Sequence, residues 1–130
     1  MRKRKATLIF PFILMIVLLP SLLGGGAVGA QEKVAQVVYI TLSKACSCTL
    51  ERCQAGDIAV GNVFNGARQS LLKRIYYSTD RETARVYIKK YRVTQAPALL
   101  FLDAQGNLLW QAAGELSEKD VAAKLSQFGS

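Results

Sequence analysis

The feature that most limits how this chain can fold is a buried-strand pattern followed at once by a long helical pattern and then by a second strand. Residues 34–42 are rich in β-branched and aromatic side chains, which is typical of a buried strand. A helix is predicted from about residue 48 to residue 64, with a kink at Gly56, and a second strand from about residue 72 to residue 77. Two strands joined by a helix in this way are expected to be parallel, with a right-handed crossover.

The remainder of the chain continues the alternation. A capping pattern at residues 78–80, followed by Glu82, predicts a helix to Tyr91. An apolar strand at 98–102 and a strand at 108–112 flank a turn with hairpin chemistry, and Ser117 is the expected N-cap of a last helix that ends at Phe128. The predicted order is β-α-β-α-β-β-α, which favours an α/β fold with a four-stranded mixed sheet flanked by helices.

The first thirty residues have the composition of a targeting segment. Four cationic residues at positions 2–5 precede an apolar run at 6–23, and small residues at 28–30 offer a cleavage site. Residues 1–30 are therefore expected to be a signal peptide or, if uncleaved, an N-terminal membrane anchor that contacts the membrane only through residues 6–23. Either way, residues 31–130 are expected to form one domain on the periplasmic or extracytoplasmic side of the membrane.

Removing that segment lowers the formal net charge. Lys plus Arg falls from 17 to 13 while Asp plus Glu stays at 9, so the net charge falls from +8 to +4. The remaining basic residues include those at 73–74, 85 and 89–92, without the interleaved aromatic pattern of a nucleic-acid binder. We therefore expect a solvated basic face and no nucleic-acid partner.

A family resemblance appears at Tyr91-Arg92-Val93-Thr94-Gln95-Ala96-Pro97. This stretch, the apolar strand after it, Gly106 in the hairpin, Gly114 and the last helix together resemble the thioredoxin superfamily, as does a cysteine turn between a strand and a helix. The resemblance covers nearly all of residues 34–128 and implies a thioredoxin-like fold. It also implies that Pro97 is cis and lies beside the cysteine turn, and that Ala96 and Pro97 border the place where an extended substrate segment binds.

The cysteine turn departs from the pattern of that family. The usual motif is Cys-x-x-Cys, but here Thr49 stands at the second cysteine position when Cys46 is aligned with the first, and Cys48 supplies a thiol one position earlier. The frequent Trp before the first cysteine is Ala45, and the buried acidic residue of the preceding strand maps near Ile40. The resemblance thus implies the fold but not efficient general disulfide reduction.

Cys46 is the expected nucleophile. A thiol at the start of a helix lies beside free backbone N–H groups and the positive end of the helix dipole, which favour the thiolate. Lys44 adds positive potential if it points inward, and Thr49 is placed to hydrogen-bond the sulfur of Cys46. Cys48 is the expected resolving thiol, and a Cys-x-Cys ring is small enough that its disulfide should be easily reduced.

Cys53 is a possible third thiol, although packing against the sheet is its favoured role. The predicted function is extracytoplasmic thiol–disulfide exchange through Cys46 and Cys48, with protein thiols or disulfides and a membrane electron-transfer partner, and with no cofactor. Two alternatives stay open. One is the binding of a soft metal or metalloid by Cys46, Cys48 and Cys53. The other is a thioredoxin-like module that binds a partner without catalysis.

Overall fold

The computed structural model describes residues 32–129, so the predicted targeting segment at 1–30 lies outside the described residues. The elements are β1 (Gln36–Thr41), α1 (Ser47–Val63), the 3-10 helix η1 (Gly66–Leu71), β2 (Leu72–Tyr76), α2 (Arg81–Tyr91), β3 (Ala98–Leu102), β4 (Leu108–Ala113) and α3 (Glu118–Phe128). Apart from the short η1, this is the predicted order. The helical hydrogen-bond pattern of α1 continues through Gly56, where a kink was predicted.

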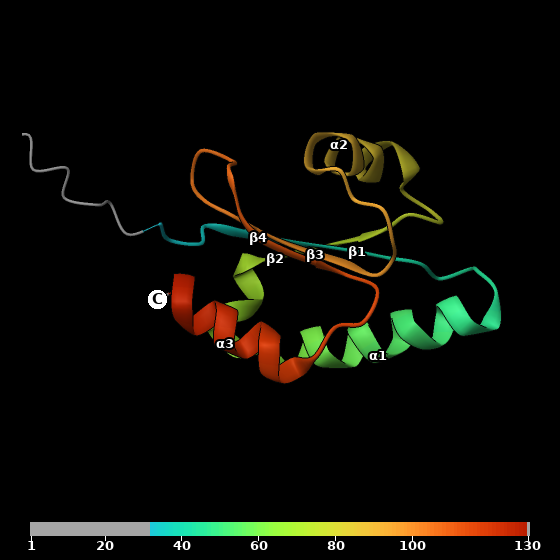
Figure 1. The fold of residues 1–130 in the computed structure, drawn as a ribbon, viewed down its shortest axis with the longest axis horizontal. Coiled ribbons are helices and arrows are strands. Elements are labelled where there is room, and N and C mark those ends of the chain that lie inside the picture. Colours follow the sequence, from blue (N-terminus) through green and yellow to red (C-terminus); the bar gives the residue numbers. More distant parts are fainter. Residues whose placement is uncertain (1–31, 130) are drawn as a thin grey trace, which may run out of the picture.

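The four strands form one mixed sheet in the order β2-β1-β3-β4. β1 pairs in parallel with β2 and antiparallel with β3, and β3 pairs antiparallel with β4. Helices α1 and α3 lie on one face of the sheet and α2 lies on the other (Figure 1). The predicted four-stranded mixed sheet with helices on both faces is confirmed.

The core has two layers because the central strands are buried on both faces. Successive residues of a strand point to opposite sides, so Val37 and Tyr39 pack with Val60 under α1 and α3, whereas Val38 and Ile40 pack under α2. β3 is buried along its whole length. Each fully buried Val, Leu, Ile or Phe contributes about 1.5–3 kcal/mol relative to an exposed one, so these strands supply much of the free energy of folding.

The helices begin where the capping residues predict. The side chain of Asp80 accepts a hydrogen bond of 3.4 Å from the backbone N–H of Thr83 at the start of α2. The hydroxyl of Ser117 accepts one of 3.4 Å from the N–H of Asp120 at the start of α3, as predicted. These bonds satisfy N–H groups that a helix leaves unpaired in its first turn.

The two ends of the described chain meet beside the sheet. The N–H of Val34 donates a hydrogen bond of 2.8 Å to the carbonyl of Phe128, and the N–H of Ala35 donates one of 2.8 Å to Leu102. Val34 lies before the start of β1 and the cysteines lie after its end, so both chain ends are at the opposite end of the strands from the cysteine turn. Within residues 32–129, no helix combines the length and apolar character that crossing a bilayer demands.

Candidate functional site

Cys46 is the N-cap residue of α1. Its backbone is extended (φ −62°, ψ 157°), and its carbonyl accepts hydrogen bonds of 3.1 Å from the N–H of Thr49 and 3.0 Å from that of Leu50. The chain leaves β1 at Thr41, turns through four residues and enters the helix directly after Cys46. The predicted position of this thiol at the start of a helix is confirmed.

The sulfur of Cys46 has two close neighbours. It lies 3.1 Å from the hydroxyl oxygen of Thr49 and 3.5 Å from the sulfur of Cys48. The expected contact between Thr49 and Cys46 is thereby confirmed, and both cysteines are exposed. The Thr49 hydroxyl, the Thr49 backbone N–H and the Cys48 thiol lower the pKa of Cys46 from 9.0 to about 7. A substantial share of this thiol is therefore ionised near neutral pH.

Cys53 has a different environment, because its side chain is 1 % exposed. It lies on the inner stripe of α1, spaced along the helix with the buried Gly56 and Val60. Among residues 32–129, no group of three or more Cys, Asp, Glu or His side chains is arranged to hold a metal ion. The described cysteines thus comprise one exposed neighbouring pair and one buried thiol.

The Ala96–Pro97 peptide bond is cis, as the resemblance implied. Pro97 is buried, and its carbonyl accepts a hydrogen bond of 2.8 Å from the N–H of Gly114. The loop lies against α1 at Gly56, since a Cβ added to that glycine would come 2.9 Å from Cγ of Pro97. This glycine therefore permits close contact between the loop and α1, at a point ten residues, or about 15 Å of helix, after Cys46.

The cysteine turn is also tied to the opposite side of the sheet. The hydroxyl of Ser78, between β2 and α2, accepts hydrogen bonds of 3.1 Å from the N–H of Ser43 and 3.2 Å from that of Lys44. Lys44 itself is exposed. The loop that carries Cys46 is thus fixed to the segment that leads into α2.

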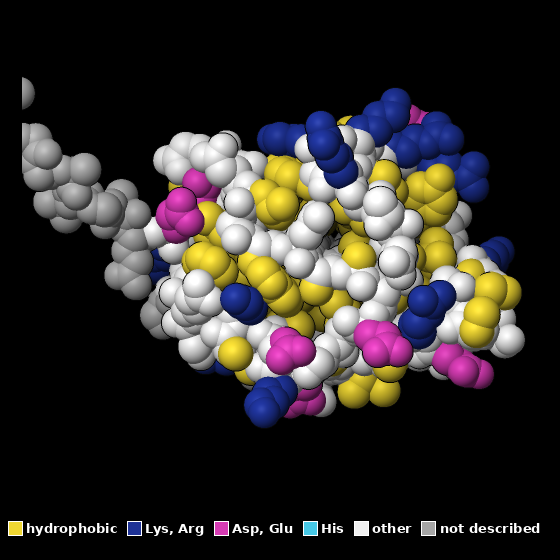
Figure 2. Space-filling model, in the orientation of Figure 1, with side chains coloured by type: hydrophobic (Ala, Val, Ile, Leu, Met, Phe, Trp, Pro, Cys, Tyr) yellow, Lys and Arg dark blue, Asp and Glu magenta, His cyan; other side chains and the backbone are white. Residues whose placement is uncertain are grey.

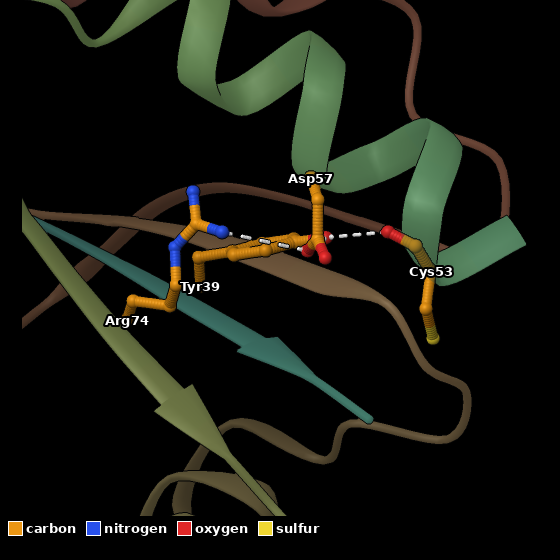
Figure 3. Close-up of polar contacts among 4 residues, drawn as sticks. All are labelled: Tyr39, Cys53, Asp57 and Arg74. Atoms are coloured by element: carbon orange, nitrogen blue, oxygen red, sulfur yellow. Dashed lines mark hydrogen bonds and ion pairs between the residues drawn. The ribbon is translucent and has the colours of Figure 1, made fainter. Parts of the chain in front are cut away.

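A partly buried polar cluster beneath α1 was not anticipated from the sequence. The hydroxyl of Tyr39 on β1 donates to Oδ1 of Asp57 at 2.7 Å and also lies 3.2 Å from the carbonyl of Cys53 (Figure 3). Arg74 on β2 lies 3.7 Å from the same carboxylate. Ile40, where the acidic residue of the family was mapped, faces α2 instead. The spacing of Asp57, four residues after Cys53 on the inner stripe, was the signal that could have revealed this cluster.

The fold and the cysteine turn together define a domain of the thioredoxin-like fold with an exposed, neighbouring pair of thiols. In agreement, the chain superposes on the C-terminal domain of DsbD from Neisseria meningitidis in its reduced form, with a TM-score of 0.53 and 12% identity. That match covers 75% of this chain and 83% of the other, and at this identity the likeness establishes the fold alone.

Two further solved structures give lower scores. An uncharacterized thioredoxin-like protein from Clostridium perfringens has a TM-score of 0.48 and 16% identity, over 76% of this chain and 74% of the other. A thioredoxin from Aeropyrum pernix has a TM-score of 0.46 and 16% identity, over 74% and 75%. No protein-family model and no curated protein sequence matches the chain.

Proposed function

We propose that this protein catalyses thiol–disulfide exchange, with Cys46 as the nucleophile and Cys48 as the resolving thiol. The observation that carries the proposal is the position of the Cys46 sulfur, which is exposed at the start of α1, 3.1 Å from the Thr49 hydroxyl and 3.5 Å from the Cys48 sulfur. A helix start and a hydroxyl donor both stabilise a thiolate, which is the attacking species in exchange.

The exchange takes two steps. The thiolate of Cys46 attacks one sulfur of a substrate disulfide, forms a mixed disulfide and releases the other substrate sulfur as a thiolate. The thiol of Cys48 loses its proton, attacks the sulfur of Cys46 and releases the second substrate thiolate. The protein is then oxidised to a Cys46–Cys48 disulfide and the substrate has gained two electrons. A dithiol donor restores the protein, and the same steps in reverse oxidise a substrate dithiol.

The cis Ala96–Pro97 loop is the proposed substrate contact. It packs against α1, the helix that the cysteines begin, and Ala96 is half-buried, so its backbone has access to an extended segment of a partner. The loop contacts α1 at Gly56, ten residues after Cys46, so a substrate segment held there would extend about 15 Å along α1 to bring its cysteine to Cys46. Ala96 and Pro97 are therefore proposed to bind the substrate and not to react with it.

The proposed location is outside the cytoplasm, reached through residues 1–30 as a signal peptide or membrane anchor. The basis is the cationic start, the apolar run and the small residues that follow it. In that location a membrane electron-transfer partner is the expected source or acceptor of electrons. A reporter that is active only in the cytoplasm should give no signal when fused after Ser130, and strong activity would contradict this location.

The deciding experiment maps which cysteines pair. The protein without residues 1–30 is oxidised gently, free thiols are blocked, bridged peptides are identified by mass spectrometry, and metal content is measured on the same sample. We expect a Cys46–Cys48 bridge, a free thiol at Cys53, and loss of exchange activity in Cys46→Ser. Cys53→Ser is the matched control and should retain activity.

Other outcomes separate the alternatives. A dominant Cys46–Cys53 bridge would keep the exchange reaction but replace Cys48 as the resolving thiol. One retained soft metal ion, with all three thiols protected, would favour metal binding. Free thiols, no metal and no effect of Cys46→Ser would favour a module that only binds a partner.

A further inference from the structure

An apolar cavity of about 280 Å³ opens beside the cysteine turn, on the side of the sheet that α2 covers. Its walls come from the end of β1, from Tyr77, from Ile88 on α2 and from the segment that leads into the cis proline; they include Ile40, Leu42, Val93 and Ala96. Leu42 precedes Cys46 by four residues, a length of chain that spans at most about 14 Å. The Ser78 hydroxyl holds the intervening loop against this side of the molecule. A short extended peptide could therefore reach both the cavity and the thiol.

A group of basic side chains lies on α2 and β2, next to this cavity. The α2 face, defined here as the exposed Lys73, Arg81, Arg85, Lys89, Lys90 and Arg92, holds six of the thirteen basic residues between 32 and 129. Between Lys73 and Arg92 the chain has only two acidic residues, Asp80 and Glu82. The α2 face is therefore rich in cations, and Lys and Arg side chains crowd over α2 (Figure 2).

Helix stability explains only part of this distribution. Cations in the last turn of a helix are favoured by its dipole, which accounts for Lys89 and Lys90. Arg81 stands in the first turn, where the dipole disfavours a cation, and its guanidinium lies 5.3 Å from the ring of Tyr77, which is a wall of the cavity. Arg85 is exposed in the middle of the helix, and its nearest carboxylate, on Glu82, lies 3.9 Å away and is 92% exposed. These cations are free to meet an external anion.

We infer that the substrates of this protein carry an apolar side chain and acidic residues near their reactive cysteine, the apolar side chain entering the cavity and the acidic residues facing α2. This inference rests on the proposed exchange activity of Cys46 and adds the chemistry of the substrate. Charge complementarity is the argument for the occupant, because a face with six exposed cations attracts acidic segments and raises their rate of encounter. The cavity supplies an apolar contact at the place where such a segment would lie.

A membrane surface fits the same face less well. A helix that lies in a bilayer interface presents a broad apolar face to the lipid, but the apolar residues Ala84, Ile88 and Tyr91 of α2 pack against the sheet. Val86, which is 64% exposed, is the one large apolar side chain that α2 exposes strongly. An acidic, partly apolar peptide matches both the charge and the cavity.

The test measures how fast Cys46 reacts with two short peptides, each with one cysteine carried as a mixed disulfide with thionitrobenzoate. Attack by Cys46 joins it to the peptide and releases the coloured thionitrobenzoate anion, so the step is balanced and directly visible. One peptide has glutamates and a leucine near the cysteine, and the other has lysines in place of the glutamates.

We expect the acidic peptide to react about tenfold faster at low salt, and the difference in rate to shrink as salt is added. Replacing the leucine by glycine should slow the acidic peptide by roughly tenfold.

Two double variants with the same change in net charge locate the effect. Arg85→Glu with Lys89→Glu should abolish the preference for the acidic peptide, whereas Arg68→Glu with Lys119→Glu, which lie off the α2 face, should keep it. A small neutral disulfide should react equally with both variants, since neither touches the thiols. Equal rates for the two peptides, or preference for anionic vesicles over the acidic peptide in a binding assay, would overturn the inference. No reaction of Cys46 with any disulfide would instead refute the proposed function.

Discussion

The hydroxyl of Tyr39 on β1 lies 2.7 Å from Oδ1 of Asp57 on α1, and this pair joins the centre of the sheet to the helix that begins at the cysteines. Burial raises the pKa of Tyr39 well above its ordinary value, so the hydroxyl stays protonated and donates a hydrogen bond to the carboxylate. Tyr39→Phe should lower the free energy of unfolding by about 2 kcal/mol, because a hydrogen bond to a charged group is lost. Urea denaturation measures this change.

The control for this variant is Tyr76→Phe, which removes an equivalent hydroxyl from the neighbouring strand, where the side chain is 37% exposed. It should leave the midpoint of unfolding unchanged. Equal stability of Tyr39→Phe and the parent protein would show that the contact to Asp57 contributes nothing.

Two glycines of α1 should respond in opposite directions to the same substitution. A Cβ at Gly56 would lie 2.8 Å from the Tyr39 hydroxyl and 2.9 Å from Cγ of Pro97, whereas a Cβ at Gly61 would meet nothing within 4 Å. Alanine favours a helix by up to about 1 kcal/mol relative to glycine. Gly61→Ala should therefore raise the melting temperature, and Gly56→Ala should lower it. A stabilising Gly56→Ala would contradict the close packing of α1 on the proline loop.

The pH dependence of Cys46 should follow its hydrogen bond to Thr49. Because the pKa of Cys46 is lowered to about 7 and only the thiolate is alkylated, its alkylation rate should rise with pH through a midpoint near 7. Thr49→Val removes the hydroxyl and should move that midpoint upward, toward the ordinary thiol value. Ser47→Ala in the same turn is the control. An unshifted midpoint in Thr49→Val would show that the backbone N–H groups at the helix start and the Cys48 thiol lower the pKa without the Thr49 hydroxyl.

Ser78→Ala should loosen the cysteine turn without unfolding the domain. The Ser78 hydroxyl is the acceptor for the N–H groups of Ser43 and Lys44, so both amides should exchange with deuterium faster in the variant. Ser70→Ala, which removes an exposed hydroxyl bonded to Ala67 in η1, should leave both rates unchanged. Unaltered exchange in Ser78→Ala would mean that other contacts hold the turn.

The parts of the fold that sequence predicts well are those fixed by local chemistry. The apolar run of β3 and the capping residue of α3 give both elements their observed bounds. β1 begins at Gln36 and not at residue 34, where the apolar pattern starts. The reason is that the backbone N–H of the buried Val34 donates its hydrogen bond to the carbonyl of Phe128 in α3 and not to a strand. The contact of Thr49 with Cys46 spans three residues of one helical turn, which is why it could be anticipated.

The parts that were missed depend on how distant segments meet. Tyr39 and Asp57 are 18 residues apart, and they approach only because the crossover lays α1 on the face of β1 that Tyr39 occupies. The sequence predicted a solvated basic face, but not that β2 adds Lys73 to the cations of α2 beside an apolar cavity. Neither arrangement follows from composition or spacing alone.

The hydrogen bond from the Val34 N–H to the Phe128 carbonyl has a consequence for how the domain is displayed. Both ends of the folded unit emerge together, and β1, with six residues and a length of about 20 Å, separates them from the cysteine turn. A tether attached at either end therefore holds the domain at the end opposite the cysteine turn, so that the thiols point away from the point of attachment. The length of the tether then sets how far the thiols can extend toward a partner. A carrier protein fused to either end leaves the cysteines equally accessible.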